Sequence, residues 1–427
     1  MVLAHRHTRR SRLSGEARTM HFDESPEDAA FRAEARAWLE AHASLRRGEG
    51  DWSNGPADHS PLAEREYFDR CRQWQQTRFD HGWAGITWPV SVGGRGGSVW
   101  QEIIFNQEMA RFDVTSGFLA ATIGMVGALL LTHGNDDQRA RYQRRLLRGD
   151  DAWCQLFSEP GAGSDLANLS ARADRDGDVF VVSGQKVWNS NAHLCDWGIL
   201  IARTNFDAPK HKGITFFIVD MRTPGIEPRP LRQITGHTHF TEVFLTDVRI
   251  PAANIVGSVD DGWGPTRTVL SSEATMIGST TTSGNAAAVI ALARGVGCAG
   301  DHRVRQRLAR IVSEERILAY MSDRVLSAVR TGSPSPIDAS LLKVYWSETR
   351  AYRDEVAVDL LGAAGMLAGT HAPKNGYWQT QMLNRYWGTV GGGTSEVHRN
   401  MIGERALGLP AEPRVDKDAP FSRPTKN

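Results

Sequence analysis

The chain has 427 residues, of which 41% are hydrophobic and 23% are charged, and these values are ordinary for globular proteins. At this length two or three domains are expected rather than one core. Because 50 basic residues are balanced by 49 acidic ones, the net charge provides no electrostatic basis for binding nucleic acid or an anionic membrane.

Cysteine spacing and the N-terminal residues favour a reduced, cytoplasmic protein. The cysteines are far apart in the sequence, with no pair at metal-ligand or redox spacing: Cys71, Cys154, Cys195 and Cys298. We therefore expect no metal site. Residues 1–20 carry several arginines but no apolar core, which excludes a secretory signal. We expect residues 1–25 to be a disordered extension, and a start codon placed too early is the alternative. The most apolar run, 118–131, is too short to span a membrane and predicts a buried helix.

Helical periodicity dominates residues 26–150. Apolar residues recur at helical spacing between Phe31 and Leu39, and again between Ile103 and Phe112. These patterns predict an N-terminal helical domain.

Short strands are expected between residues 151 and 262. Four runs are rich in β-branched or aromatic residues and are bounded by turn-forming residues: 179–182, 198–202, 213–219 and 242–245. Asp176-Gly177, just before the first run, is typical of a tight hairpin turn. This part of the chain therefore predicts a small, antiparallel central β domain.

Helical periodicity returns between residues 263 and 410. Long helical segments are expected at 286–294, 303–330 and 341–361, and they predict a C-terminal helix bundle. Residues 411–427 combine prolines with charges and predict a loose tail. The predicted fold class is thus α+β and multidomain, with a β domain between two helical ones.

Two segments of the central domain carry chemical signals. Residues 155–165 read Gln-Leu-Phe-Ser-Glu-Pro-Gly-Ala-Gly-Ser-Asp, a turn whose backbone N–H groups can approach a flat or phosphorylated ligand. Residues 185–191 read Gln-Lys-Val-Trp-Asn-Ser-Asn, so Trp188 and Ser190 share one face of an extended strand. An aromatic plane beside a hydroxyl suits a planar heteroaromatic cofactor. Taken separately, an ordinary turn and a tryptophan in a barrel core are the alternatives.

Together, these segments resemble the two signature segments of the acyl-CoA dehydrogenase family of flavoproteins, and the similarity extends from about Phe31 to Pro410. The resemblance implies the same order of domains and an FAD cofactor. It also implies that one group of residues binds this cofactor: Gln155, Phe157, Ser158, Gly163, Ser164, Trp188, Ser190, Thr394 and Glu396. At Ser190 the family more often has threonine.

A third segment, residues 390–396, reads Val-Gly-Gly-Gly-Thr-Ser-Glu. Three glycines before a good helix N-cap describe a nest of backbone N–H groups, with a flexible turn as the alternative. By resemblance, Gly392 stands where many members carry the catalytic glutamate. Its N–H would still hold the thioester carbonyl, with Ser164 also near the substrate, and Thr394 would contact the flavin nucleotide.

The resemblance suggests another position for the catalytic base. Isovaleryl-type and long-chain members carry it eleven residues after the glycine of a Gly-Trp or Gly-Phe helix start, which leads from Gly262-Trp263 to Glu273. Ala274 follows, where the family usually has arginine. We therefore expect Glu273 to abstract the α proton while hydride passes from Cβ to flavin N5, which gives a trans-2-enoyl thioester. A solvated helix glutamate is the alternative.

Partners are also implied by the resemblance: an acyl-CoA or acyl-carrier thioester with a branched, long or bulky acyl group, an electron-transfer flavoprotein, and other subunits of a homo- or hetero-oligomer. Segments 298–307 and 361–365 depart from those that many members supply to the flavin of a neighbouring subunit. A weakly catalytic or non-catalytic partner subunit of a heteromer is therefore one alternative function. A flavin oxidase or monooxygenase on the same fold is another.

Overall fold

The computed structural model describes residues 24–47, 51–56, 60–279, 285–331, 337–413 and 418–422, without the side chains of 273–279, 285 and 329. The expected disordered extension, apart from its last two residues, lies outside these ranges. Among the described residues, the first part of the chain forms five α-helices: α1 (Pro26–His42), α2 (Pro61–Asp80), α3 (Val99–Met109), α4 (Gly117–His133) and α5 (Asp136–Arg148). Helix α4 is the buried helix expected from its apolar run. Within the described ranges, none of the helices is both long enough and apolar enough to cross a bilayer.

Local sequence explains where several of these helices begin and end. Ser25, Ser60, Ser98 and Asn135 each accept a hydrogen bond from the backbone N–H three residues later, at the starts of α1, α2, α3 and α5. Gly149 ends α5 with a φ of 81°, a conformation that costs glycine little. The helix boundaries are thus encoded locally.

Seven strands follow: β1 (Trp153–Leu156), β2 (Arg172–Asp176), β3 (Val179–Ser190), β4 (Trp197–Arg203), β5 (Ile214–Asp220), β6 (Ile226–Leu231) and β7 (Phe240–Pro251). They form one sheet in the order β1-β4-β2-β3-β7-β6, with β5 on the other edge of β4. The β2–β3 hairpin turns at Gly177 as expected. The sheet is mostly antiparallel, but β1 runs parallel to β4. This pairing arises because the chain passes through the β2–β3 hairpin before it returns beside β1.

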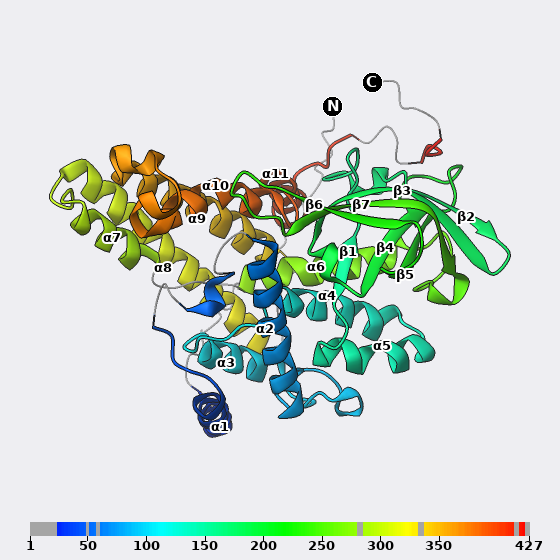
Figure 1. Ribbon diagram of the computed structural model, residues 1–427, viewed down its shortest axis with the longest axis horizontal. Helices are drawn as coiled ribbons and strands as arrows, with labels where there is room; N and C mark the ends of the chain where they lie inside the picture. The colour runs from blue at the N-terminus through cyan, green and yellow to red at the C-terminus, as the bar shows by residue number, and fades with distance from the viewer. Residues whose placement is uncertain are drawn as a thin grey trace, which may run out of the picture.

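Both faces of the sheet are covered where β4 lies. Ile199 and Ile201 pack into a hydrophobic core that includes residues of α2, α4 and α5. Leu200 and Ala202, on the opposite face, pack into a second core built from the strands themselves. Strands buried on both faces have continuous apolar sequences rather than alternating ones. Figure 1 shows α4 and α5 beneath the strands and the C-terminal helices extending to the other side of the molecule.

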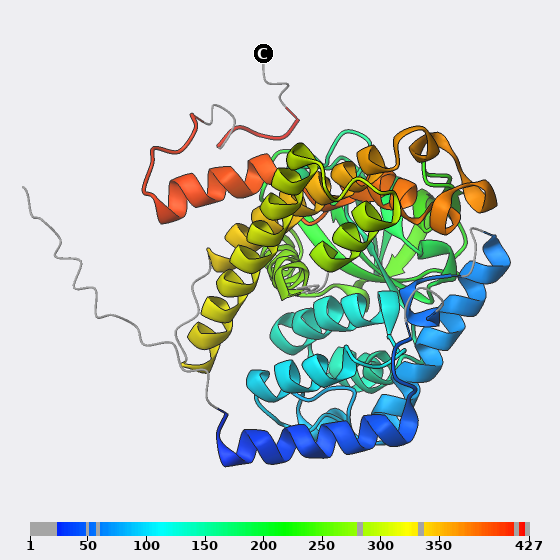
Figure 2. The ribbon, with the colours of Figure 1, turned by 90° about the vertical axis from the view of Figure 1, so that its left-hand side faces the viewer.

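The C-terminal part contains α6 (Trp263–Ser279), α7 (Asn285–Gly295), α8 (His302–Arg330), α9 (Asp338–Leu360), α10 (Tyr377–Val390) and α11 (Ser395–Met401). Helices α7, α8, α9 and α10 share a hydrophobic core of their own. Helix α8 also contacts α3, and Figure 2 shows it running along the side of the molecule. The expected helix bundle is therefore confirmed.

Part of the segment expected to be a loose tail, residues 418–422, lies against the β domain. Backbone N–H groups of Phe421 and Ser422 donate to the carbonyl oxygens of Ala208 and Phe206, at 3.0 and 2.8 Å. The Phe421 ring lies 3.6 Å from the guanidinium carbon of the buried Arg203. A cation facing an aromatic ring is attracted to it, and this contact explains why residues 418–422 lie against the β domain.

Candidate active site

The glycine-rich loop that follows β1 is a tight turn. Glu159 and Ala162 exchange two backbone hydrogen bonds, both 3.0 Å long, around Pro160 and Gly161. A Cβ atom added at Gly161 or Gly163 would meet nothing within 4 Å, so the surrounding protein does not require glycine at either position. The open space fits a backbone that must be approached closely by a group outside the chain. Ser164 is exposed beside it.

A buried ion pair fixes this loop to β3. Nζ of Lys186 lies 2.7 Å from a carboxylate oxygen of Glu159 and 3.1 Å from the carbonyl oxygen of Phe157. The Glu159 carboxylate also accepts the backbone N–H groups of Ser170 and Ala171. Burial raises the pKa of Glu159, but Lys186 and these N–H groups outweigh it and lower that pKa overall. Burial also lowers the pKa of Lys186.

This ion pair was not predicted from the sequence, although both residues belong to the signature segments. The signal was present: a lysine within a strand pattern and a glutamate within a glycine-rich turn each need a partner if they are buried. Their pairing depends on the fold.

Trp188 is presented to solvent by an irregularity in β3. The register with β7 shifts between Lys186 and Asn189, and Trp188 adopts a φ of 64°, which is unusual for a non-glycine residue. Its side chain is 61% exposed, whereas Asn189 is buried and donates to the carbonyl oxygen of Thr241 at 3.1 Å. The exposure excludes the barrel-core alternative for Trp188. Backbone strain of this kind occurs where surrounding contacts impose it, often at binding sites.

The other cofactor residues expected in the β domain lie along the same loop and strand. The Ser158 carbonyl accepts the N–H of Val187 at 2.9 Å, so the glycine-rich loop lies beside the strand that carries Trp188 and Ser190. Gln155 is half-buried on β1. Unlike Gln155, Phe157 has a buried side chain: its ring packs edge-on against Phe216, with centroids 5.6 Å apart.

The triple-glycine loop is built on a separate support, α9. Gly392 and Gly393 have φ values of 66° and 94°, in the region that favours glycine. Thr394 is the N-cap of α11 and accepts the N–H of Val397 at 3.2 Å. Glu396 is exposed in the first turn, where hydrogen bonds from its own backbone N–H and from Thr394 lower its pKa.

Two buried side chains hold the carbonyl groups of this loop. Nε2 of His398 lies 2.9 Å from the carbonyl oxygen of Gly392, and Nδ1 lies 3.0 Å from the Ser340 hydroxyl on α9. Because a carbonyl oxygen can only accept, Nε2 carries the proton. Lys343, also on α9, donates to the carbonyl oxygen of Gly393. In a trans peptide the C=O and the next N–H point in opposite directions, so the N–H of Gly393 is directed away from His398.

Glu273 lies in α6, but its side chain falls outside the described residues. The start of this helix is well defined. A Cβ atom at Gly262 would lie 2.7 Å from the backbone nitrogen of Phe216, so only glycine fits there. Across α6, Thr268 lies 2.9 Å from Nε2 of His133 on α4. Helix α6 is therefore anchored to both the sheet and the N-terminal helices.

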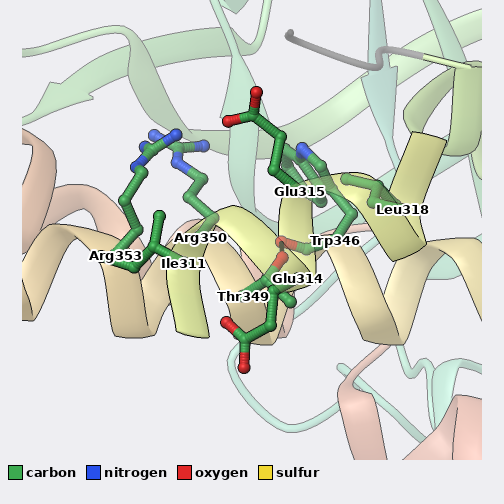
Figure 3. Close-up of a pocket in the computed structure, with 8 residues that line it drawn as sticks. All are labelled: Ile311, Glu314, Glu315, Leu318, Trp346, Thr349, Arg350 and Arg353. Atoms are coloured by element: carbon green, nitrogen blue, oxygen red, sulfur yellow. Dashed lines mark hydrogen bonds between the residues drawn. The ribbon is translucent and has the colours of Figure 1, made fainter. Parts of the chain in front are cut away.

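A small cavity between α8 and α9 is a different candidate. It has a volume of about 30 Å³ and is lined by residues of both helices, including Glu314 and Trp346. Figure 3 shows Arg350 and Arg353 among the residues that line it. Ligand pockets usually enclose about 300 Å³ or more, so this cavity is too small for an acyl thioester.

Comparison with known proteins agrees with the geometry of the β domain. Three family models match successive parts of the chain: the N-terminal domain of acyl-CoA dehydrogenases over residues 25–150, the middle domain over 154–248 and the C-terminal domain over 260–407. This chain belongs to the acyl-CoA dehydrogenase family. Its members are flavin-dependent oxidoreductases, so the expected family, fold class and enzyme type are confirmed.

Several acyl-CoA dehydrogenases are similar over almost their full length. "Acyl-CoA dehydrogenase IpdE1" of Mycobacterium tuberculosis is 33% identical over 387 residues, which is 90% of this chain and 98% of the relative. "Acyl-CoA dehydrogenase FadE29" of the same organism is 30% identical over 402 residues, or 92% of this chain and 100% of the relative.

Two solved structures share the fold at 29% identity. The "Tcur3481-Tcur3483 steroid ACAD" has a TM-score of 0.76, and the "ChsE4-ChsE5 complex from Mycobacterium tuberculosis" has a TM-score of 0.72. Each comparison covers 92% of this chain and 100% of the other. The second structure is described as a complex.

Proposed function

We propose that this chain is an FAD-dependent dehydrogenase that converts a saturated acyl-CoA, or acyl-carrier, thioester to the trans-2-enoyl thioester. The observation that carries the proposal is the exposed Trp188, held at a strand bulge beside a glycine-rich loop with open space above Gly161 and Gly163. An exposed indole and an accessible backbone are suited to the ring system and the pyrophosphate of FAD. When bound, FAD would supply the hydride acceptor.

The residues of this chain fit that cofactor. Gln155 and Ser158 offer polar groups beside the glycine-rich loop, and Ser190 offers one on the strand that carries Trp188. Gly163 and Ser164 are exposed residues of the glycine-rich loop. Thr394 and Glu396 would reach the nucleotide from the start of α11. The buried Glu159–Lys186 pair would keep the loop in place.

We assign the base to Glu273 and the thioester carbonyl to the N–H of Gly392. Gly392 has no side chain that could act as a base, and Glu273 is the carboxylate at the alternative family position, on a helix whose start is anchored by Gly262. Glu273 would take the α proton, and the Gly392 N–H would stabilise the developing enolate oxygen. Because relatives of this chain include a steroid ACAD, a bulky acyl group is the favoured substrate class.

An electron-transfer flavoprotein would accept the electrons. The described residues contain no membrane-spanning helix, and we propose a cytoplasmic site of action.

A second candidate function is that of a partner subunit with little catalysis of its own. It is favoured by Ala274, where the family usually has arginine, and by the departures at 298–307 and 361–365. The similar ChsE4-ChsE5 structure is described as a complex, and an assembly of two different chains would suit this alternative.

One experiment separates the two. The full chain is purified, its FAD content per protomer is measured, and the flavin is titrated anaerobically with a panel of acyl-CoA thioesters that includes bulky ones. We expect bound FAD that is bleached by one class of thioester. Glu273→Gln should keep FAD and lose bleaching, and substantial residual bleaching would reject Glu273 as the base. A chain without FAD would support the partner-subunit function.

A further inference from the structure

Glu64 on α2 is a charged residue held in an unusually well-defined contact. It is 9% exposed and lies 174 positions from its partner, Thr238, in the loop between β6 and β7. One carboxylate oxygen accepts the backbone N–H of Thr238 at 3.0 Å, and the other accepts the Thr238 hydroxyl at 2.8 Å. Hydrogen bonds to a charged group are stronger than neutral ones. The contact therefore ties an N-terminal helix to a loop of the β domain.

The loop that Glu64 holds, residues 232–239, is closed on itself. The backbone N–H of Gln233 donates to the carbonyl of His237, and the N–H of Gly236 donates back to the carbonyl of Gln233, both at 2.9 Å. The Gln233 side chain lies 3.1 Å from Nδ1 of His239. With these internal bonds, an anchor at Thr238 restrains the whole loop.

The far end of this loop supports Trp188. The carbonyl of His239 accepts the N–H of Asn191 at 2.6 Å, and Phe240 pairs with Ser190 across β7 and β3. The Phe240 ring meets the Trp188 indole edge-on, with centroids 6.0 Å apart at 87°. The path from Glu64 to the indole thus consists of the hydrogen bonds to Thr238, two peptide bonds to Phe240 and one ring contact.

The charge of the same carboxylate acts on two histidines of the β domain. Burial lowers the pKa of His193 and of His239, while the Glu64 charge acts in the opposite direction on both. His193 also lies 3.1 Å from the Thr241 hydroxyl, next to the strand that carries Phe240. The arrangement around Glu64 is therefore compact and polar.

We propose that Glu64 is a positioning residue: through Thr238 and Phe240 it holds the Trp188–Ser190 edge of β3 in the conformation that receives the flavin. The inference rests on the proposed binding of FAD against Trp188. Glu64 does not touch the cofactor in this account. It restrains the loop on which the indole leans.

The test compares FAD binding by the full-length apoprotein of four variants with the original chain, by titration and flavin fluorescence. Glu64→Ala removes both hydrogen bonds, and we expect FAD affinity to fall by about 10-fold or more. Glu64→Gln keeps an acceptor for the Thr238 N–H and a partner for the Thr238 hydroxyl. Its FAD affinity should therefore lie within about 3-fold of that of the original chain. Glu66→Ala, on the exposed side of the same helix, is the matched control and should leave affinity unchanged.

The fourth variant is the double substitution Glu64→Ala with Thr238→Ala. Because both changes remove one shared interaction, it should bind FAD no worse than Glu64→Ala alone. The midpoint potential of the bound flavin is measured as well, since a general loss of stability would not shift it. Wild-type affinity and potential in Glu64→Ala would overturn the proposal, as would failure of Glu64→Gln to restore them.

Failure of the proposed function gives a different result, namely an original chain that binds no FAD. Hydrogen exchange of the apoprotein then decides the role of Glu64. Faster exchange of backbone amides in residues 232–241 of Glu64→Ala, restored in Glu64→Gln, would support the restraint, and equal exchange rates would overturn it.

Discussion

Nζ of Lys186 lies 2.7 Å from Oε1 of Glu159, and Lys186 is completely buried. This contact joins the glycine-rich loop to the strand that presents Trp188. A buried charge that loses its partner is costly, whereas a pair removed together is often tolerated. The two halves of the candidate cofactor site are thus held together by a buried pair of opposite charges.

We predict that the effects on stability of changing Lys186 and Glu159 are strongly coupled. Lys186→Met should lower the free energy of unfolding by about 3–5 kcal/mol and reduce FAD retention, because the Glu159 carboxylate stays buried without its cation. Adding Glu159→Gln should recover part of this loss. Urea unfolding of the single and double variants measures the loss of stability and its recovery. A loss below about 1 kcal/mol for Lys186→Met would contradict the prediction.

Trp188 should matter for binding more than for stability. Because its side chain is 61% exposed, Trp188→Ala should change the free energy of unfolding by less than about 1 kcal/mol. FAD affinity should fall by about 10-fold through lost stacking. Trp188→Gly should be at least as stable as Trp188→Ala, since glycine adopts the observed φ of 64° without strain. Thermal unfolding and FAD titration test these expectations, and a large stability loss in Trp188→Ala would show instead that the indole is structural.

His398 should hold the triple-glycine loop through the proton on Nε2. His398→Leu removes the donor to the Gly392 carbonyl, and we expect KM for the thioester to rise by about 10-fold or more as the loop loses its conformation. His398→Gln can donate to the same carbonyl and accept from Ser340, so KM should return close to its original value. Steady-state kinetics of both variants, with the exposed His42→Gln as a control, provide the measurement. Equal KM values in the Leu and Gln variants would argue against the hydrogen bond.

The N-terminal domain should lose stability in acid through Glu108. Hydrogen bonds from Arg36, with further ones from Arg32 and Arg111, overcome burial and lower the pKa of Glu108 to about 2. A carboxyl with a depressed folded pKa contributes stability that is complete above its ordinary pKa, near 4.5, and is lost as pH falls toward 2. We expect a loss of about 2 kcal/mol, allowing for solvent around Arg36 and Arg111.

Urea unfolding at a series of pH values tests the role of Glu108. Glu108→Gln should be about 2 kcal/mol less stable than the original chain near pH 7 and nearly equal to it near pH 2. Parallel stability curves for the two proteins would show that Glu108 does not supply this pH dependence.

Much of the fold follows from local patterns. Helical periodicity placed α7, α8 and α9 within a few residues of their ends, because apolar residues at helical spacing need a common buried face. The Gly177 turn and the β-branched runs located β3, β4, β5 and β7 for the same kind of local reason. The strands β1 and β6 were not located, since one is short and the other contains two prolines.

The candidate site divides in a similar way. The sequence alone determined the two signature segments, the triple glycine before Thr394, and the Gly262 start of α6, because each depends on residues adjacent in the chain. Only the tertiary structure decided that Lys186 pairs with Glu159, that Glu64 holds Thr238 from another domain, and that a register shift turns Trp188 outward. These contacts join residues far apart in sequence, so their energies depend on which elements pack together, and no local pattern encodes that.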